Sequence, residues 1–167
     1  MKPSLWGGIS AAVVLAMGAV GGGAYAAAPG AQAFVNAASQ DGITEVELGR
    51  IAQKNGTDPR VRDFGAQMVQ DHGKANAELV ALAKSKGLVV SSDLDAKHAR
   101  MIDELKSKSG HDFDVSYARH MSDAHTQAIN LFTEASRISD KEISTFATQT
   151  LPTLEEHKHM ADELVRK

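Results

Sequence analysis

Signals that end one helix and begin the next divide this sequence into long uninterrupted stretches. Asp58 followed by Pro59 is typical of a helix N-cap with proline at the first helical position. Gly87 is typical of a C-terminal stop, and Ser139-Asp140 is a second pair of capping residues. Between these signals apolar residues recur with the period of a helix, and no run alternates with the period of a strand. The sequence therefore predicts an all-α fold.

The same boundaries predict five helical segments, over about residues 34–55, 59–86, 93–108, 112–138 and 140–167. Tight connections make the first two segments antiparallel, and the same holds for the last two. The second and fourth segments are joined by a long crossover that contains the short third segment. Two antiparallel pairs joined by one long crossover form a ferritin-like four-helix bundle.

The N-terminal stretch has the three parts of a secretory signal. A short basic start is followed by an apolar run from Leu5 to Val20, and then by Ala24-Tyr25-Ala26. We therefore expect a cleavable signal peptide over residues 1–26, a flexible leader over 27–32, the bundle over 33–167, and a periplasmic or secreted protein. The alternative is an uncleaved anchor, but the run is short and rich in glycine and alanine for a segment that needs about 20 strongly apolar residues. No stable membrane span is expected after cleavage.

Composition limits the function classes. The chain has 18 Lys and Arg against 21 Asp and Glu, a formal net charge of −3, which gives no reason to expect nucleic acid as a partner. There is no cysteine, so the domain must fold without disulfides. No nucleophile elbow, phosphate loop or dinucleotide fingerprint is present, which favours a binding protein over an enzyme. An enzyme with a mononuclear metal site remains an alternative, since it needs only a free coordination position.

Each long helix carries one ionisable residue at the centre of its apolar stripe, when residues are placed at about 100° per residue. In chain order these residues are Glu45, His72, His125 and His157. Counted from the tight turns, all four lie near mid-height, within about one helical turn of one another. Burying them unpaired costs roughly 1–3 kcal/mol each, and a metal ion would satisfy them together. The four residues are the predicted metal ligands, in a set that suits a transition-metal ion: Zn, or Cu, Fe or Mn.

Other readings of these positions stay open. The histidines and the glutamate can form a metal-free buried network, in which the carboxylate balances a protonated ring. Met68 and Met121 each precede an inward histidine by four residues, and thioether ligands would favour copper, although both residues also suit apolar packing. Asp41 is a fallback carboxylate. Asp71 and Asp123 are either placed to orient imidazole N–H groups or are ordinary solvated charges.

The sequence does not supply a ferritin-type di-iron centre. Such a centre needs two inward Glu-x-x-His motifs and two further glutamates. The Glu-x-x-His spacing of Glu156 and His159 points away from the apolar stripe, so ferroxidase chemistry is disfavoured. His98, in the crossover helix, is expected to be a packing residue.

Several blocks of residues together resemble a known family. The blocks are Glu45-Val46-Glu47-Leu48-Gly49, Met68-Val69-Gln70-Asp71-His72 with Asn76 and Leu79, Phe113-Asp114 with Tyr117, His125, and Leu151-Pro152-Thr153-Leu154-Glu155-Glu156-His157. They resemble a bacterial exported ferritin-like family that is catalogued as a domain of unknown function and often labelled "putative outer membrane protein". The resemblance covers about residues 33–165. It implies the fold, export and the recurrence of this histidine set, but no known reaction.

Overall fold

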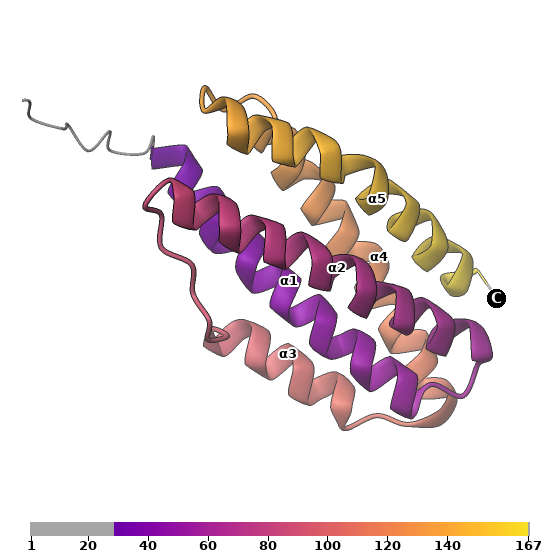
Figure 1. Cartoon of the computed structure of the whole chain (residues 1–167). Helices are drawn as coiled ribbons and strands as arrows, with labels where there is room; N and C mark the ends of the chain where they lie inside the picture. Colours follow the sequence, from indigo (N-terminus) through magenta and orange to yellow (C-terminus); the bar gives the residue numbers. More distant parts are fainter. Residues whose placement is uncertain (1–28, 167) are drawn as a thin grey trace, which may run out of the picture.

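The computed structural model describes residues 29–166, and these residues form five α-helices with no strand among them (Figure 1). The helices are α1 (Pro29–Asn55), α2 (Pro59–Ser85), α3 (Ala96–Lys106), α4 (Gly110–Ala135) and α5 (Lys141–Val165). The predicted all-α fold is confirmed. The expected signal peptide over residues 1–26 lies outside the described residues and stays a prediction, as does the location that follows from it.

The four long helices form two antiparallel pairs, α1 with α2 and α4 with α5, which pack against each other (Figure 1). Residues 86–109 connect α2 to α4 and return along the length of the bundle, so α2 and α4 run in the same direction. The short helix α3 lies in this crossover, where it packs on α1 and touches α4. The predicted bundle, with a long crossover and an extra short helix, is confirmed. Within residues 29–166, no helix has the length and hydropathy needed to cross a membrane.

Aspartates cap three of the helices. The Asp58 and Asp140 side chains accept hydrogen bonds from main-chain amides in the first turns of α2 and α5, as predicted. Asp95 does the same for α3, which therefore begins at Ala96 rather than near residue 93. At the end of α2, Gly87 adopts a φ of +67°, the left-handed conformation that commonly ends a helix.

Helix α1 begins at Pro29, ahead of the predicted start near residue 34, because its first turns belong to the core. Phe34 is buried against aromatic rings of α4 and α5. The Gln32 side chain donates to the carbonyl of Val89 at 2.8 Å and accepts from its amide at 3.0 Å, which fixes the start of the crossover on α1. Residues 29–32, which were expected in the leader, are therefore helical.

Two clusters of apolar side chains fill the interior, one toward each end of the bundle. The cluster that we call the Phe132 cluster joins the start of α1, the end of α2, the end of α4 and the start of α5. The cluster that we call the Met68 cluster joins the opposite ends of these helices and α3. Each long helix contributes to both: α2, for example, places Leu79 in the first and Met68 in the second. Between the clusters each long helix carries a buried ionisable residue.

Two glycines allow α1 and α2 to approach closely beside the Met68 cluster. A Cβ atom at Gly65 would lie 2.7 Å from the Ala52 Cβ and 2.8 Å from the carbonyl oxygen of Gly49. A Cβ atom at Gly49 would lie 2.6 Å from the carbonyl oxygen of Gly65. The spacing of the two helices is therefore set by main-chain contact, which only glycine permits.

Asp114 connects the start of α4 to the turn between α1 and α2. Its buried carboxylate accepts hydrogen bonds from the main-chain amides of Thr57 and Asp58, at 3.0 and 2.8 Å, and from the Thr57 hydroxyl. This contact fixes the first antiparallel pair against the second at the Met68 end of the bundle.

Candidate metal centre

Three histidines from three different helices meet in the middle of the bundle. His72 of α2, His125 of α4 and His157 of α5 are all at most 9% exposed. One ring nitrogen of each lies within 4.8 Å of the others, and the ring centroids are between 5.3 and 5.5 Å apart. The structure therefore brings together the three histidines that the helical pattern placed at the centres of the apolar stripes.

His72 and His125 face each other through their Nε2 atoms, which lie 3.4 Å apart. The Nδ1 atom of His125 lies 2.9 Å from the carbonyl oxygen of Met121. Because a carbonyl only accepts, this Nδ1 carries the proton, and the Nε2 atom of the neutral ring directs its lone pair toward His72. His125 is thus held in a tautomer that can bind a metal through Nε2.

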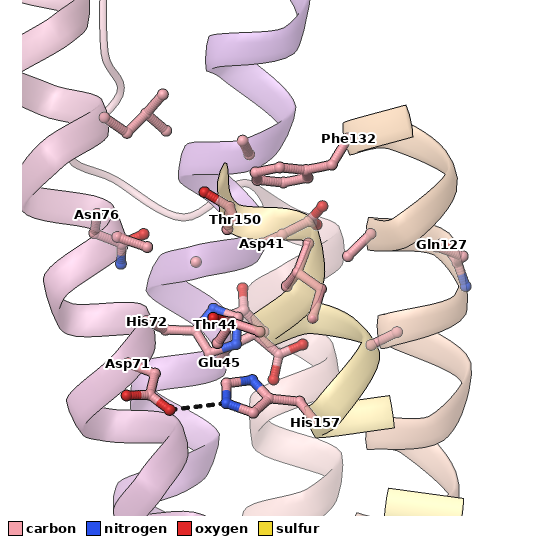
Figure 2. A pocket seen from close by; sticks show the side chains of 18 of the residues that line it. Asp41, Thr44, Glu45, Asp71, His72, Asn76, Gln127, Phe132, Thr150 and His157 are labelled. Carbon is pink, nitrogen blue, oxygen red and sulfur yellow. Dashed lines mark hydrogen bonds and ion pairs between the residues drawn. The ribbon is translucent and has the colours of Figure 1, made fainter. Parts of the chain in front are cut away.

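His157 is oriented by Asp71, a residue of α2. The Nε2 atom of His157 donates to the Asp71 carboxylate across 2.9 Å (Figure 2). The Nδ1 atom of the same ring is buried and has no hydrogen-bond partner. The predicted contact of Asp71 with an inward imidazole is confirmed. For Asp123, the described residues show no hydrogen bond to a histidine.

Glu45 belongs to the same polar layer but stands apart from the histidine group. It is 5% exposed and lines the cavity beside the histidines, and its Oε2 atom has no partner. Its carboxylate is not among the ligand atoms that lie within 4.8 Å of one another. Burial, and to a lesser extent the charge of Asp41, raises the pKa of Glu45 to about 8, so this carboxyl is mainly protonated at neutral pH.

The rings of His72 and His125 are neutral at pH 7. Burial lowers the pKa of His72 well below its usual value, and it lowers the pKa of His125 to about 4. The neighbouring histidines lower both values further, because two imidazolium charges would repel each other. Neutral imidazole is the form that binds a metal ion, so protons compete weakly for these two ligands.

Three buried polar atoms of this region lack a hydrogen-bond partner in the described chain: Oε2 of Glu45, Nδ1 of His157 and the hydroxyl of Tyr117. Burial, and then the Glu45 carboxylate, raise the pKa of Tyr117 well above its usual value. Buried polar atoms are nearly always satisfied by protein, water or an ion, and each one left unpaired costs about 1–3 kcal/mol. The Glu45 and His157 atoms belong to the polar layer and line the cavity, whereas Tyr117 packs in the Met68 cluster. Two unsatisfied atoms beside the cavity are compatible with a further ligand in this region.

A cavity of about 270 Å³ lies beside the histidines. Its inner end is lined by Glu45, His72 and His157, which Figure 2 shows close together. Lys97 and Gln127 also line it, and since both side chains are exposed, the cavity reaches the surface. There is consequently room for water or a small ligand next to the histidines.

A second polar group in this cavity was not predicted. His98 of α3, which was expected to be a packing residue, lies between two carboxylates, with Nδ1 2.8 Å from Asp95 and Nε2 3.2 Å from Asp41. His120 and Asp123 of α4 line the same cavity. The inward position of Asp41 was predictable from its own helix. Its pairing with His98 depends on how α3 packs on α1, which neither helix encodes locally.

The sequence matches a family described as "Domain of unknown function (DUF4142)" over residues 19–164. The expected resemblance to a family of unknown function is thereby confirmed. In three dimensions the chain is similar to a "DUF305 fragment from Deinococcus radiodurans", with a TM-score of 0.72 at 17% sequence identity. The match covers 84% of this chain and 98% of that one, and it supports the fold alone. No curated protein matches the sequence.

Proposed function

Because the chain belongs to the family described as Domain of unknown function (DUF4142), whose description states no activity, we propose its function from the site itself. The protein binds one divalent transition-metal ion in the middle of the bundle and holds it, as a metal-binding or metal-buffering protein. The ligands are His72, His125 and His157, with Glu45 as the candidate fourth ligand. The observation that carries this proposal is the convergence of three buried histidine rings from three helices.

The spacing of two of these rings suits a single ion. Two nitrogens bound at about 2.0–2.1 Å to a tetrahedral ion lie about 3.3–3.4 Å apart. The Nε2 atoms of His72 and His125 are separated by 3.4 Å. The third nitrogen, on His157, is within 4.8 Å of both and has to move closer to them to complete the set.

Two of the rings also have the support that metal-ligating histidines usually have. A carboxylate or carbonyl behind the second ring nitrogen fixes the tautomer and makes the ligand nitrogen more basic. The Met121 carbonyl does this for His125, and the Asp71 carboxylate does it for His157. The unpartnered Nδ1 of His157 is then the atom that faces the ion.

Three imidazoles with one carboxylate or water suit Zn²⁺ in a four-coordinate site, and they also suit Cu²⁺, Fe²⁺ or Mn²⁺. Thioether ligands are not needed for this set. Met68 and Met121 are fully buried within the Met68 cluster, and we assign them to apolar packing.

We also propose that the protein works outside the cytoplasm, in the periplasm or after secretion. This proposal rests on the predicted signal peptide over residues 1–26. A histidine site that uses no cysteine suits an oxidising compartment, where thiol ligands are lost to oxidation. Buffering a transition metal there would protect the cell envelope from metal-driven oxidative damage.

Metal titration tests the binding proposal. Protein purified without an affinity tag is stripped with a chelator and titrated with Zn²⁺, followed by calorimetry, and with Co²⁺, followed by visible absorption. We expect one ion per chain and the Co²⁺ spectrum of a four-coordinate site. The double variant His72→Ala, His125→Ala should weaken Zn²⁺ binding by more than the roughly 100-fold that loss of a single supporting residue costs.

The matched control is the double variant His111→Ala, His159→Ala. It removes two histidines that are exposed and lie outside the cavity lining. If both double variants bind Zn²⁺ as tightly as the parent protein, the proposed function is wrong.

A metal-free polar network is the second candidate, and the contacts that form without an ion favour it. These are the pair of His72 with His125 and the pair of His157 with Asp71. The protein would then be a structural or interaction module of the bacterial envelope. In that case Zn²⁺ and chelator both leave the melting temperature unchanged, whereas an ion that binds the folded state raises it.

A further inference from the structure

We propose that Asp41 and His98 form an outer cation site in the cavity, where a divalent transition-metal ion binds before it passes to the three histidines. This inference rests on the proposed metal-binding function. It adds the path by which the ion reaches ligands that solvent does not reach directly.

The inner ligands require such a path. His125 and His157 are 1% and 0% exposed, so an ion cannot bind them from bulk water in one step. The cavity of about 270 Å³ extends from exposed side chains to His72 and His157. At about 30 Å³ per water molecule, this volume accommodates an ion with part of its hydration shell. The remaining water must then be replaced by protein ligands along the way.

The outer pair has the geometry of a supported histidine ligand. His98 is 8% exposed, and its Nδ1 atom is held at 2.8 Å by Asp95, which does not line the cavity. Its Nε2 atom lies 3.2 Å from the Asp41 carboxylate, and both residues line the cavity. An ion that replaces the proton between them gains one imidazole and one carboxylate ligand.

The ligand groups continue inward from this pair. Asp41 precedes Glu45 by four residues, so the two carboxyl groups follow each other on one face of α1, about 6 Å apart along the axis. Glu45 has the unpartnered, fully buried Oε2 atom and lines the cavity together with His72. Figure 2 shows Asp41, Glu45 and His157 in succession. A cation therefore meets an oxygen or nitrogen ligand at each turn of the helix.

The charge of the cavity wall favours a cation over an anion. The aspartates Asp41, Asp71 and Asp123 line the cavity, and Lys97 is the one lysine or arginine among the described residues of the lining. Glu45 adds little charge, because it is mainly protonated at neutral pH. His120 lies on the opposite wall, on α4, near enough to His98 for their charges to interact. A cleft whose charge is mainly of one sign raises the local concentration of the opposite ion and the rate at which that ion binds.

The test separates the rate of loading from the affinity. Chelator-treated protein is mixed rapidly with Co²⁺, and the visible absorption of the bound ion is followed with time. Asp41→Asn should lower the loading rate constant by about tenfold, the lower end of the range for electrostatic guidance. The equilibrium affinity should change less than twofold, because the ion comes to rest on the inner histidines. Release to excess chelator should slow by the same factor as loading, since the ion leaves by the path it entered.

Asp103→Asn is the matched control. It makes the same charge change at an exposed position of α3 that does not line the cavity, and it should load like the parent protein. Equal melting temperatures of the two variants exclude misfolding as the cause, and His98→Gln should slow loading in the same way as Asp41→Asn.

Two results would overturn the inference and leave the proposed function standing. In the first, Asp41→Asn loads as fast as Asp103→Asn while the parent protein still binds Co²⁺, and the proposed function is unaffected. In the second, affinity falls as much as the loading rate, with unchanged release, which would place Asp41 in the final site. A parent protein that binds no Co²⁺ removes the proposed function and this inference together.

Discussion

The Nε2 atom of His157, on α5, donates to the carboxylate of Asp71, on α2, across 2.9 Å. This contact determines which nitrogen of the ring is free. The Nδ1 atom keeps its lone pair and faces no partner in the described chain. The ring is completely buried, whereas the Asp71 side chain is 30% exposed, so a carboxylate near the surface sets the state of a ligand atom in the interior.

Removing this carboxylate tests its role in metal binding. Asp71→Ala should weaken Zn²⁺ binding by about 10–100-fold, because the ring loses the group that fixes its tautomer and orientation. Competition with a chelator of known affinity measures the change. Asp63→Ala removes an exposed carboxylate from the same helix and should leave the affinity unchanged. Equal affinities of the two variants would show that Asp71 does not support a ligand.

The stability of the metal-free protein should reach a maximum near pH 6.5. Glu45 has a pKa raised from 4.5 to about 8, so the folded state binds its proton more tightly than the unfolded state does. Deprotonation therefore destabilises the fold as pH rises from about 4.5 to 8. The pKa values of His72 and His125 are lowered, so protonation of these two groups in the unfolded state removes stability as pH falls below 6.5.

Above pH 6.5 the effect of Glu45 is no longer opposed by the two histidines. The free energy of unfolding should fall by about 1–2 kcal/mol between pH 6.5 and 8, since one pKa unit corresponds to about 1.4 kcal/mol. Urea denaturation in the presence of EDTA measures this fall. Glu45→Gln should abolish it, and a Gln variant that loses stability as the parent does would contradict the assignment.

The close contact of α1 and α2 predicts opposite effects for two glycine substitutions on one helix. Gly65→Ala should lower the free energy of unfolding by about 1–3 kcal/mol, because its Cβ would lie 2.7 Å from that of Ala52. At Gly73 no atom lies within 4 Å of an added Cβ. Gly73→Ala should stabilise the protein by about 0.5–1 kcal/mol through helix propensity alone. Urea denaturation of both variants provides the comparison, and effects of the same sign would refute this account of the helix contact.

The connection between the two helix pairs depends on Asp114. Asp114→Ala removes the acceptor of the amide hydrogen bonds from Thr57 and Asp58, and should cost about 2 kcal/mol of stability. Asp112→Ala removes an exposed carboxylate from the first turn of the same helix, where the helix dipole alone is affected, and should cost less than about 1 kcal/mol. Thermal or chemical denaturation distinguishes the two, and equal losses would mean that the buried hydrogen bonds contribute nothing specific.

The fold was predictable because the ends of its helices depend on single residues with strong local conformational preferences. Asp58 and Asp140 cap helices, and Gly87 takes the left-handed conformation that ends one. The three histidines were predictable for a related reason: each is an isolated polar residue in an apolar stripe, and the helical period fixes the face on which it lies.

What could not be predicted depends on contacts between distant segments. The first turns of α1 look like a flexible leader in sequence, and they are helical because Phe34 meets rings of α4 and α5. His98 pairs with Asp41 only because α3 lies on α1. The helical wheel placed Glu45 inward correctly, but it does not specify whether the side chain extends to the histidine rings.

The polar layer between the Phe132 cluster and the Met68 cluster has a consequence for how the molecule unfolds. Each apolar cluster stabilises one end of all four long helices, and contacts between the ends pass through the layer of Glu45, His72, His125 and His157. Folding cooperativity should be weakest across such a layer. Each end of the bundle is therefore a candidate for partial unfolding on its own. A metal ion bound in this layer by residues of α2, α4 and α5 would couple the two ends of the bundle, so that they unfold together. Metal binding could then be detected far from the site by amide hydrogen exchange, because the amides at both ends of the bundle would become protected to the same degree.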